Sequence, residues 1–376
     1  MSAARTYLDW NATAPLRREA RTAMLAALDI VGNPSSPHAE GRRARAIVED
    51  AREQVAQLVG AKPAEVVFTS GGTEGNNAVL AAGWDAILVA GIEHDSVLAP
   101  ARNSRSRLIE MPVGSNGVVR RDELSASMTQ LKGGRALLTL QMANNETGVL
   151  QPVAEVARDA RAHGLAVHTD AVQAAGRLTV DIAELGVDYL TLSAHKLGGP
   201  KGVGALVIRE RAVLPPLISG GGQERRRRAG TENVAAIVGF GAAAEAAQRD
   251  LARTPRVQAL REQLEGGVRA ITPEAVIIAE SAARLPNTTS LALPRASAET
   301  LVIALDLAGI AVSAGAACSS GKVGASHVLA AMGVEPLLGR SAIRISLGHG
   351  STERDVASFL AAWSHIAVGR RERAVA

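Results

Sequence analysis

The chain has 376 residues, a formal net charge of +4 and a hydrophobic fraction of 47%, which is typical of an ordinary globular protein. Trp, Tyr and Phe together number eight and the basic residues are scattered, so we expect no nucleic-acid interface, which would use aromatic side chains for base stacking. The single cysteine excludes an intrachain disulfide framework and suits a reducing compartment.

The N-terminal stretch M-S-A-A-R-T-Y-L-D-W has no apolar segment of the kind found in secretory signals. The longest apolar run, residues 234–247, is interrupted by Glu245 and is too short to cross a bilayer. We therefore predict a cytoplasmic protein with no membrane partner.

Short apolar runs alternate with helical patterns, which predicts an α/β fold with a mostly parallel sheet. Residues 39–59 form an expected amphipathic helix with Ile47, Ala51 and Val55 on one face. Strands are predicted at residues 65–68, 86–90, 136–140, 165–168, 189–193 and 204–208, with helices between many of them, including residues 153–163.

The pattern changes near the R-T-P sequence at residues 253–255. A helix to about residue 270 is expected next, followed by N-T-T-S-L-A-L, a helix at 298–307, the cysteine segment and a closing helix from Thr352. We predict a large domain of residues 16–253 and a smaller α/β domain of residues 1–15 and 254–376, which carries a cysteine loop at about 313–324.

The only cysteine, Cys318, lies in S-A-G-A-A-C-S-S-G-K (313–322). Most free cysteines are small buried hydrophobes, but here no bulky apolar neighbour defines a core position. The alternative is a nucleophile on a loop whose small residues lower the cost of changing conformation. The stretch is not a nucleotide-binding P-loop, because its glycines are six residues apart and Val323 replaces the Ser or Thr that holds Mg²⁺.

Lys196 follows a predicted strand within the glycine-rich turn S-A-H-K-L-G-G (193–199). This places it at the carboxyl end of a strand, where α/β sheets bind ligands. A solvated loop lysine is the alternative, but Ser193 and His195 beside it are hydrogen-bonding side chains rather than further charges. A lysine that forms Schiff bases is the attachment point of pyridoxal 5′-phosphate (PLP).

PLP makes two further demands that the sequence meets. Its pyridine nitrogen needs a carboxylate partner, and Asp170 ends an apolar strand in A-V-H-T-D, where burial would favour a cationic partner; a helix N-cap is the alternative role. Its phosphate needs backbone N–H donors, and S-G-G-T-E-G (70–75) between a strand and a helix provides a helix N-terminus.

Two other residues stand in settings that indicate ligand contact. His94, in G-I-E-H-D-S-V after the 86–90 strand, is suited to stack on a flat cofactor and to move protons, although a structural histidine has the same pattern. Arg344 lies between apolar residues in S-A-I-R-I-S-L-G, so it requires an anion, either a substrate carboxylate or an internal ion pair.

These stretches and others occur in order along the whole chain. They include Y-L-D-W-N-A-T-A-P (7–15), G-N-P-S-S-P-H (32–38), T-S-G-G-T-E-G-N-N (69–77), N-N-E-T-G (144–148), H-T-D-A-V-Q (168–173), S-A-H-K (193–196), G-T-E-N (230–233), A-A-C-S-S-G (316–321) and I-R-I-S-L-G (343–348). The set resembles the cysteine desulfurases of the NifS/IscS type, which are PLP-dependent members of the class-V aminotransferase family. The resemblance implies fold type I, as in aspartate aminotransferase, with a mostly parallel seven-stranded sheet in the large domain.

The resemblance also implies roles for individual residues. Lys196 matches the PLP-attaching lysine, Asp170 the partner of the ring nitrogen, Gln173 the donor to the ring hydroxyl, and His94 the stacking and catalytic histidine. Gly72, Thr73, Ser193 and His195 match the phosphate site, Asn145 matches a ligand of both cofactor and substrate, and Arg344 matches the ligand of the substrate carboxylate. Cys318 matches the persulfide-forming cysteine, and Thr231 a threonine that reaches the phosphate of the neighbouring subunit in a homodimer.

The implied activity is removal of sulfur from L-cysteine, giving L-alanine and a persulfide on Cys318 that passes to an iron–sulfur scaffold or another acceptor protein. No intrinsic metal site is implied. A selenocysteine lyase, a related aminotransferase and a non-catalytic scaffold are the alternatives. Two features depart from the family pattern: W-N-A-T-A-P (10–15) is a variant of the usual entrance sequence, and the arginine run at 225–228 is more basic than the motif requires. We interpret most of that run as a solvated or interface face.

Overall fold

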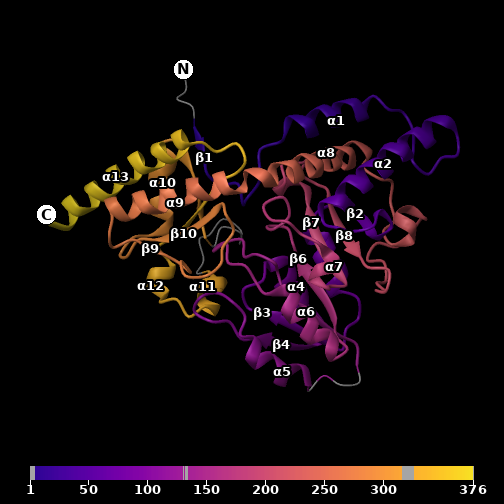
Figure 1. The fold of residues 1–376 in the computed structure, drawn as a ribbon, viewed down its shortest axis with the longest axis horizontal. Helices are drawn as coiled ribbons and strands as arrows, with labels where there is room; N and C mark the ends of the chain where they lie inside the picture. The colour runs from indigo at the N-terminus through magenta and orange to yellow at the C-terminus, as the bar shows by residue number, and fades with distance from the viewer. Residues whose placement is uncertain (1–4, 130, 132–133, 316–325, 376) are drawn as a thin grey trace.

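The computed structural model describes residues 5–129, 131, 134–315 and 326–375 (Figure 1). Cys318 and most of the predicted cysteine loop lie outside the described residues.

The larger sheet has seven strands, in the spatial order β2-β8-β7-β6-β5-β3-β4. Their bounds are β2 (Val66–Thr69), β8 (Gly204–Ile208), β7 (Tyr189–Ser193), β6 (Ala166–Asp170), β5 (Ala136–Thr139), β3 (Ala86–Ala90) and β4 (Arg107–Met111). β8 runs antiparallel to β2 and β7, and the other neighbouring pairs are parallel. The predicted mostly parallel seven-stranded sheet is confirmed.

The edge strand β4 was not predicted from the sequence. Its stretch R-L-I-E-M is exposed over most of its length and contains Arg107 and Glu110, so it lacks the continuous apolar run of a buried strand. Pairing with β3 holds it in the sheet. The strand predicted at 165–168 is observed at Ala166–Asp170, and Asp170 lies at its end, as expected.

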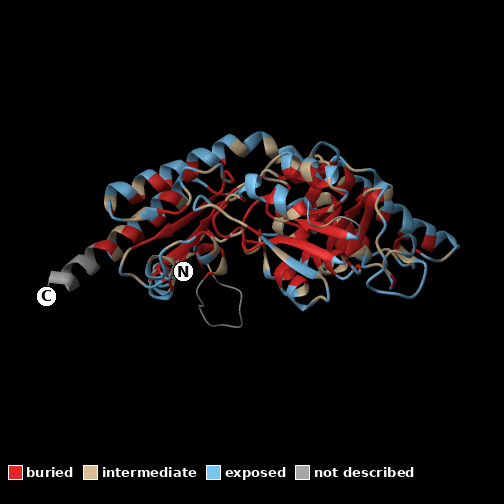
Figure 2. Ribbon diagram, turned by 90° about the horizontal axis from the view of Figure 1, so that it is seen from below, coloured by how far each residue is buried: buried red, intermediate tan, exposed pale blue. Residues whose placement is uncertain are grey.

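Helices cover both faces of this sheet, because successive apolar side chains of β3 point to opposite faces and both sets are buried. Ala86, Leu88 and Ala90 belong to one apolar cluster with α2 (Ala39–Leu58), α6 (Val153–Ala162) and α8 (Val234–Asp250). Ile87 and Val89 belong to another cluster with α3 (Gly72–Leu80) and α4 (Asp95–Asn103). Strand side chains alternate between faces, so the sheet is buried on both sides, as its red colour in Figure 2 shows. Three more helices belong to this part: α1 (Arg18–Leu28), α5 (Arg121–Thr129) and α7 (Ile182–Leu185). Of these, α1 packs on α8.

A second core lies beside the first (Figure 1). Its four-stranded antiparallel sheet has the order β12 (Ser313–Ala314), β13 (Ala342–Ser346), β10 (Thr288–Ala292) and β9 (Val276–Ile277). The helices that contribute to this core are α9 (Thr254–Ile271), α10 (Ala298–Leu307) and α13 (Glu353–Val375). Two short helices, α11 (His327–Ala331) and α12 (Pro336–Gly339), pack instead against the first cluster.

The N-terminal residues contribute to this second core. β1 (Thr6–Tyr7) pairs in parallel with β11 (Ile310–Ala311), and Leu8 is completely buried in the cluster. The predicted domain boundary near residue 253 lies between the end of α8 and the start of α9. The division into two domains stays a prediction. No helix within the described ranges is both long and apolar enough to cross a membrane.

The buried side chain of His168 makes stability depend on pH. It lies in β6 with Nδ1 2.8 Å from Thr139 Oγ1 and Nε2 3.0 Å from Thr191 Oγ1, and burial lowers its pKa to about 4, against a weaker opposing effect of Asp170. In the unfolded chain the same imidazole titrates near its ordinary pKa of about 6.5. The unfolded state therefore binds more protons between these two values, and stability falls as the pH drops through this window.

We expect urea unfolding to show a free energy that decreases from pH 7 to pH 4.5, with His168 contributing up to about 1.4 kcal/mol per pH unit. The variant His168→Gln keeps a hydrogen-bonding side chain but removes this titration, so its slope should be shallower by up to one proton. An identical slope in both proteins would contradict the assignment.

Candidate active site

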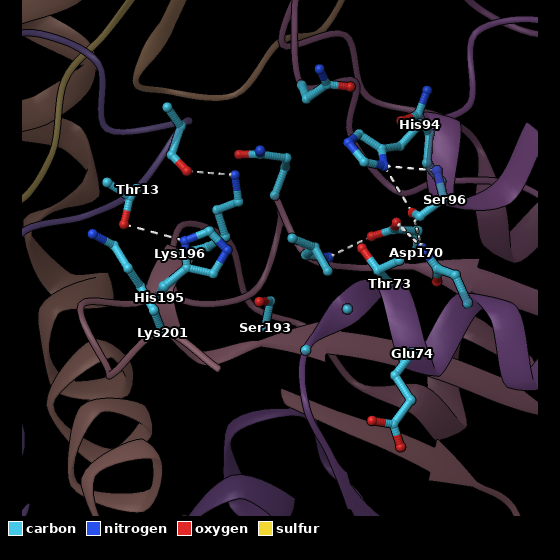
Figure 3. Close-up of a pocket in the computed structure, with 18 of the residues that line it drawn as sticks. Thr13, Thr73, Glu74, His94, Ser96, Asp170, Ser193, His195, Lys196 and Lys201 are labelled. Carbon is cyan, nitrogen blue, oxygen red and sulfur yellow. Dashed lines mark hydrogen bonds between the residues drawn. The ribbon is translucent and has the colours of Figure 1, made fainter. Parts of the chain in front are cut away.

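A cavity of about 610 Å³ lies at the carboxyl ends of the parallel strands. Nine of the residues predicted from the sequence line it: Gly72, Thr73, His94, Asn145, Asp170, Gln173, Ser193, His195 and Lys196. Figure 3 shows Lys196 and His195 on one side and His94, Ser96 and Asp170 on the other. Strands that end at one edge of the sheet therefore bring together side chains more than a hundred residues apart in sequence.

Lys196 comes from the end of β7, in the single turn Ala194–Lys196. Its Nζ donates hydrogen bonds to Asn11 O (2.5 Å) and Ala12 O (2.9 Å). The residue is half-buried, whereas Lys201, which lines the same cavity, is exposed. Lys196 is therefore a positioned amine rather than a freely solvated one.

Asp170 is 8% exposed at the end of β6. Its Oδ2 accepts a hydrogen bond from Asn76 Nδ2 (2.7 Å), and its Oδ1 accepts one from the backbone N–H of Val172 (2.9 Å). Both donors are neutral groups, so neither hydrogen bond supplies the cationic partner that a protonated ring nitrogen would be. The alternative of a helix N-cap does not hold, because residues 171–175 form turns rather than a helix.

The loop from Ser70 to Thr73 leads from β2 into the N-terminus of α3. A Cβ atom at Gly72 would come within 2.9 Å of Val172 Cγ2, so glycine lets the start of α3 approach the turn that follows β6. Unpaired N–H groups and the helix dipole make such an N-terminus suitable for a phosphate. With Lys196 and Asp170, this loop gives the cavity the three contacts that PLP needs.

His94 is the N-cap of α4, where its Nδ1 accepts the backbone N–H of Ser96 (3.1 Å) and lies 2.8 Å from Ser96 Oγ. Burial lowers its pKa, with weaker contributions from nearby charges, so the ring is neutral at pH 7. Since Nδ1 accepts from a backbone N–H, the proton of the neutral ring is on Nε2.

Two residues that sequence reasoning missed connect His94 to Asp170. Asn76 Nδ2 donates to Ser96 Oγ (2.9 Å) as well as to Asp170 Oδ2. The Asn76 side chain is buried, and its Oδ1 has no hydrogen-bond partner among the described residues. Asn76 is part of the quoted motif at 69–77, but nothing in its spacing pointed to contact with Ser96 or Asp170.

His195 and Gln173 contact the N-terminal segment that closes one side of the cavity. His195 Nδ1 lies 3.2 Å from Thr13 Oγ1, and burial together with nearby cations lowers the His195 pKa to about 4. Gln173 donates from Nε2 to Asn11 O (3.1 Å) and accepts from Arg177 at Oε1 (2.5 Å). The contact of Gln173 with a ring hydroxyl stays a prediction, and Arg177 was not foreseen from the sequence.

Arg344 lies in β13, is 6% exposed and does not line the cavity. It donates to Asp9 Oδ1 (2.8 Å) and to the backbone oxygen of Asn145 (3.0 Å), a residue that does line it. The internal ion pair left open by the sequence is therefore present. Its buried Nε has no hydrogen-bond partner in the described part of the chain, and its substrate role stays a prediction.

Besides Arg344, two predicted site residues are not placed in the cavity. Thr231 is exposed on the loop before α8 and is not among the lining residues, so its contact with a neighbouring subunit stays a prediction. Cys318 lies outside the described residues. Described residues lie on both sides of the cysteine in the sequence. Before it, Ser313 of β12 pairs with Arg344 of β13. After it, Ser326 Oγ donates a hydrogen bond to Glu146 Oε2 (2.6 Å).

The sequence also matches the family model of the class-V aminotransferases over residues 6–359. The chain belongs to the class-V aminotransferase family. It is 40% identical over 362 residues to the cysteine desulfurase IscS of Dictyoglomus turgidum, covering 93% of this chain and 91% of the relative. It is 42% identical over 364 residues to a cysteine desulfurase of Cereibacter sphaeroides, covering 94% and 93%.

Solved structures of the same family share the fold. A NifS-like protein from Rickettsia africae matches with a TM-score of 0.89 and 35% identity, over 96% of this chain and 99% of that one. The resemblance to the NifS/IscS type and the predicted fold type are confirmed. Proteins of this type are PLP-dependent, which confirms the cofactor that the residues indicated.

Proposed function

We propose that this protein is a cysteine desulfurase, which converts L-cysteine to L-alanine and keeps the sulfur as a persulfide on Cys318. The observation that carries the proposal is the single cavity that holds Lys196, Asp170 and the N-terminus of α3. Near-full-length relatives named cysteine desulfurase support it, as does the A-A-C-S-S-G sequence at 316–321.

PLP would attach to Lys196, its ring nitrogen would face Asp170, and its phosphate would bind at Gly72 and Thr73 with Ser193 and His195. When bound, it supplies an electron sink that makes the substrate Cα–H acidic. Lys196 would take the substrate Cα proton at Nζ. Asp170 would hold a proton on the ring nitrogen, since its buried carboxyl group is hydrogen-bonded by Asn76 and by the backbone of Val172, both neutral donors.

The remaining residues orient the substrate and receive its sulfur. Asn145 and Arg344 bind the substrate carboxylate, for which the buried Nε of Arg344 is an available donor. His94 would pack against the cofactor ring and would carry a proton at Nε2. The Cys318 thiolate attacks the substrate sulfur, so an S–S bond forms as the C–S bond of the substrate breaks.

The partners and location extend this proposal. We propose a homodimer in which Thr231, exposed in the single chain, reaches the phosphate site of the other subunit. An iron–sulfur scaffold is the proposed sulfur acceptor, because one relative is named IscS; tRNA thiolation and nitrogenase supply would use the same site. The single cysteine of the chain supports a reducing, cytoplasmic location.

The purified protein loaded with PLP should release L-alanine and sulfide in equal amounts from L-cysteine in the presence of a thiol reductant. Amino-group transfer to a keto acid without sulfide release would indicate an aminotransferase. Turnover confined to L-selenocysteine would indicate a selenocysteine lyase. A protein that does not bind PLP would contradict the proposed activity and also the two other PLP-dependent functions. A non-catalytic scaffold would then be the remaining function.

A further inference from the structure

The arginine run at 225–228 begins in an unusual backbone conformation. Glu224, Arg225 and Arg226 have φ angles of +46°, +57° and +67°, in the left-handed region that residues with a Cβ disfavour. Three successive residues of this kind need compensating contacts to stay in place. Two contacts, one at each end of the run, hold it in place.

The first contact is a buried ion pair at Glu224. Arg52 of α2 donates to both of its carboxylate oxygens, at 2.7 Å from Nη1 and 2.9 Å from Nη2. Glu224 Oε2 also accepts the backbone N–H of Phe68 in β2 (2.9 Å). These hydrogen bonds hold the start of the arginine run against α2 and against β2, the strand that precedes Ser70.

The second contact lies at the other end of the run and reaches the proposed phosphate site. Arg228 Nε donates to Glu74 Oε1 (3.0 Å), and its Nη2 lies 3.4 Å from Glu74 Oε2. Glu74 is in the first turn of α3 and lines the cavity, and its Oε2 accepts the backbone N–H of Ser70 (2.7 Å). In Figure 3 the Glu74 side chain points away from the other labelled residues.

A carboxylate at this place opposes the binding of a phosphate. Burial alone would raise the Glu74 pKa, but the hydrogen bonds from Arg228 and Ser70 hold that pKa below its ordinary value. Glu74 is therefore negatively charged at neutral pH, beside the N-terminus where a phosphate dianion would bind. The like charges repel, unless the guanidinium of Arg228 offsets the carboxylate.

We propose that Arg228 is a positioning residue for the phosphate group of the cofactor, acting through Glu74. It offsets the charge of Glu74 and holds the Glu74–Ser70 contact that shapes the loop, while the Arg52–Glu224 pair keeps Arg228 in place. This inference rests on the PLP site proposed above. It gives part of the arginine run a function: Arg225 and Arg226 are exposed, as expected of a solvated face, whereas Arg228 is half-buried and paired.

The test compares PLP with pyridoxal, which lacks the phosphate, in titrations of the cofactor-free protein. In Arg228→Gln the dissociation constant for PLP should rise about tenfold, because one compensating positive charge near the phosphate is lost, and the constant for pyridoxal should stay unchanged. The loss should shrink at high ionic strength. The exposed neighbour Arg226 provides the matched control, Arg226→Gln, which should bind both compounds like the parent protein.

The double variant Glu74→Gln/Arg228→Gln should recover most of the lost PLP affinity, because it removes the repelling carboxylate as well. Equal losses for PLP and pyridoxal in Arg228→Gln, or a double variant as weak as the single one, would overturn the proposal. Unchanged PLP affinity in Arg228→Gln would also overturn it and leave the proposed function intact. Failure of the parent protein to bind PLP would instead contradict the proposed function itself.

Discussion

Replacing Lys196 with alanine should lower L-alanine release from L-cysteine by at least about 10³-fold, because the residue both attaches the cofactor and moves the Cα proton. The protein should bind PLP without the absorbance of the lysine-attached form. Folding should be little affected, since the hydrogen bonds of Lys196 Nζ to Asn11 O and Ala12 O end on backbone oxygens of a loop rather than on buried charged groups. Rates and absorption spectra of the PLP-loaded proteins provide the measurement.

Lys201 gives a matched control for this experiment. It lines the same cavity but is exposed, so Lys201→Ala should retain the lysine-attached spectrum and most of the turnover. A Lys196→Ala protein that keeps the parent spectrum and rate would show that another amine attaches the cofactor.

Replacing Cys318 with alanine should abolish release of alanine and sulfide from free L-cysteine while leaving PLP absorbance and cysteine binding intact. The reason is that carbanion chemistry at Cα needs only the cofactor, Lys196 and Asp170, whereas breaking the C–S bond needs a thiolate to accept the sulfur. Because Cys318 is the only cysteine, a protein persulfide found by mass spectrometry after exposure to L-cysteine must lie at this position.

The adjacent hydroxyl serves as the control for Cys318. Ser319→Ala changes a neighbouring small side chain without touching the thiol, so it should turn over and form the persulfide as the parent protein does. Normal alanine release by Cys318→Ala would rule out the nucleophile assignment, even if the PLP site itself were correct.

Much of the site was predictable because it lies at the ends of buried parallel strands. Apolar runs locate such strands, and the polar residues at or just after their carboxyl ends are then candidate ligands, as for Asp170 at the end of β6 and Lys196 after β7. His94 was found in the same way after β3. Residues that act through another side chain gave no comparable signal: Asn76 and Ser96 are ordinary helix residues until the fold brings them against Asp170 and His94.

Ion pairs between distant segments were the least predictable part of the site. Arg344 was recognised as a buried cation, but its contact with Asp9 depends on how β13 meets the N-terminal segment. Glu74 and Arg228 are 154 residues apart, and only the packing of the 223–230 segment against β2 and α3 brings them together. A charged side chain in a sequence does not reveal its partner, because the pairing depends on tertiary geometry.

For this protein, the sequence by itself determined the α/β class, the six buried strands of the main sheet, the family and the types of residue that hold PLP. These follow from local patterns: apolar runs, glycine-rich turns and short motifs in order. Only the tertiary structure decided the edge strand β4, the small sheet built from short strands, and the polar contacts that link Asp170, Arg344 and Glu74 to their neighbours. These depend on long-range contacts, whose partners become adjacent only when the whole chain is folded.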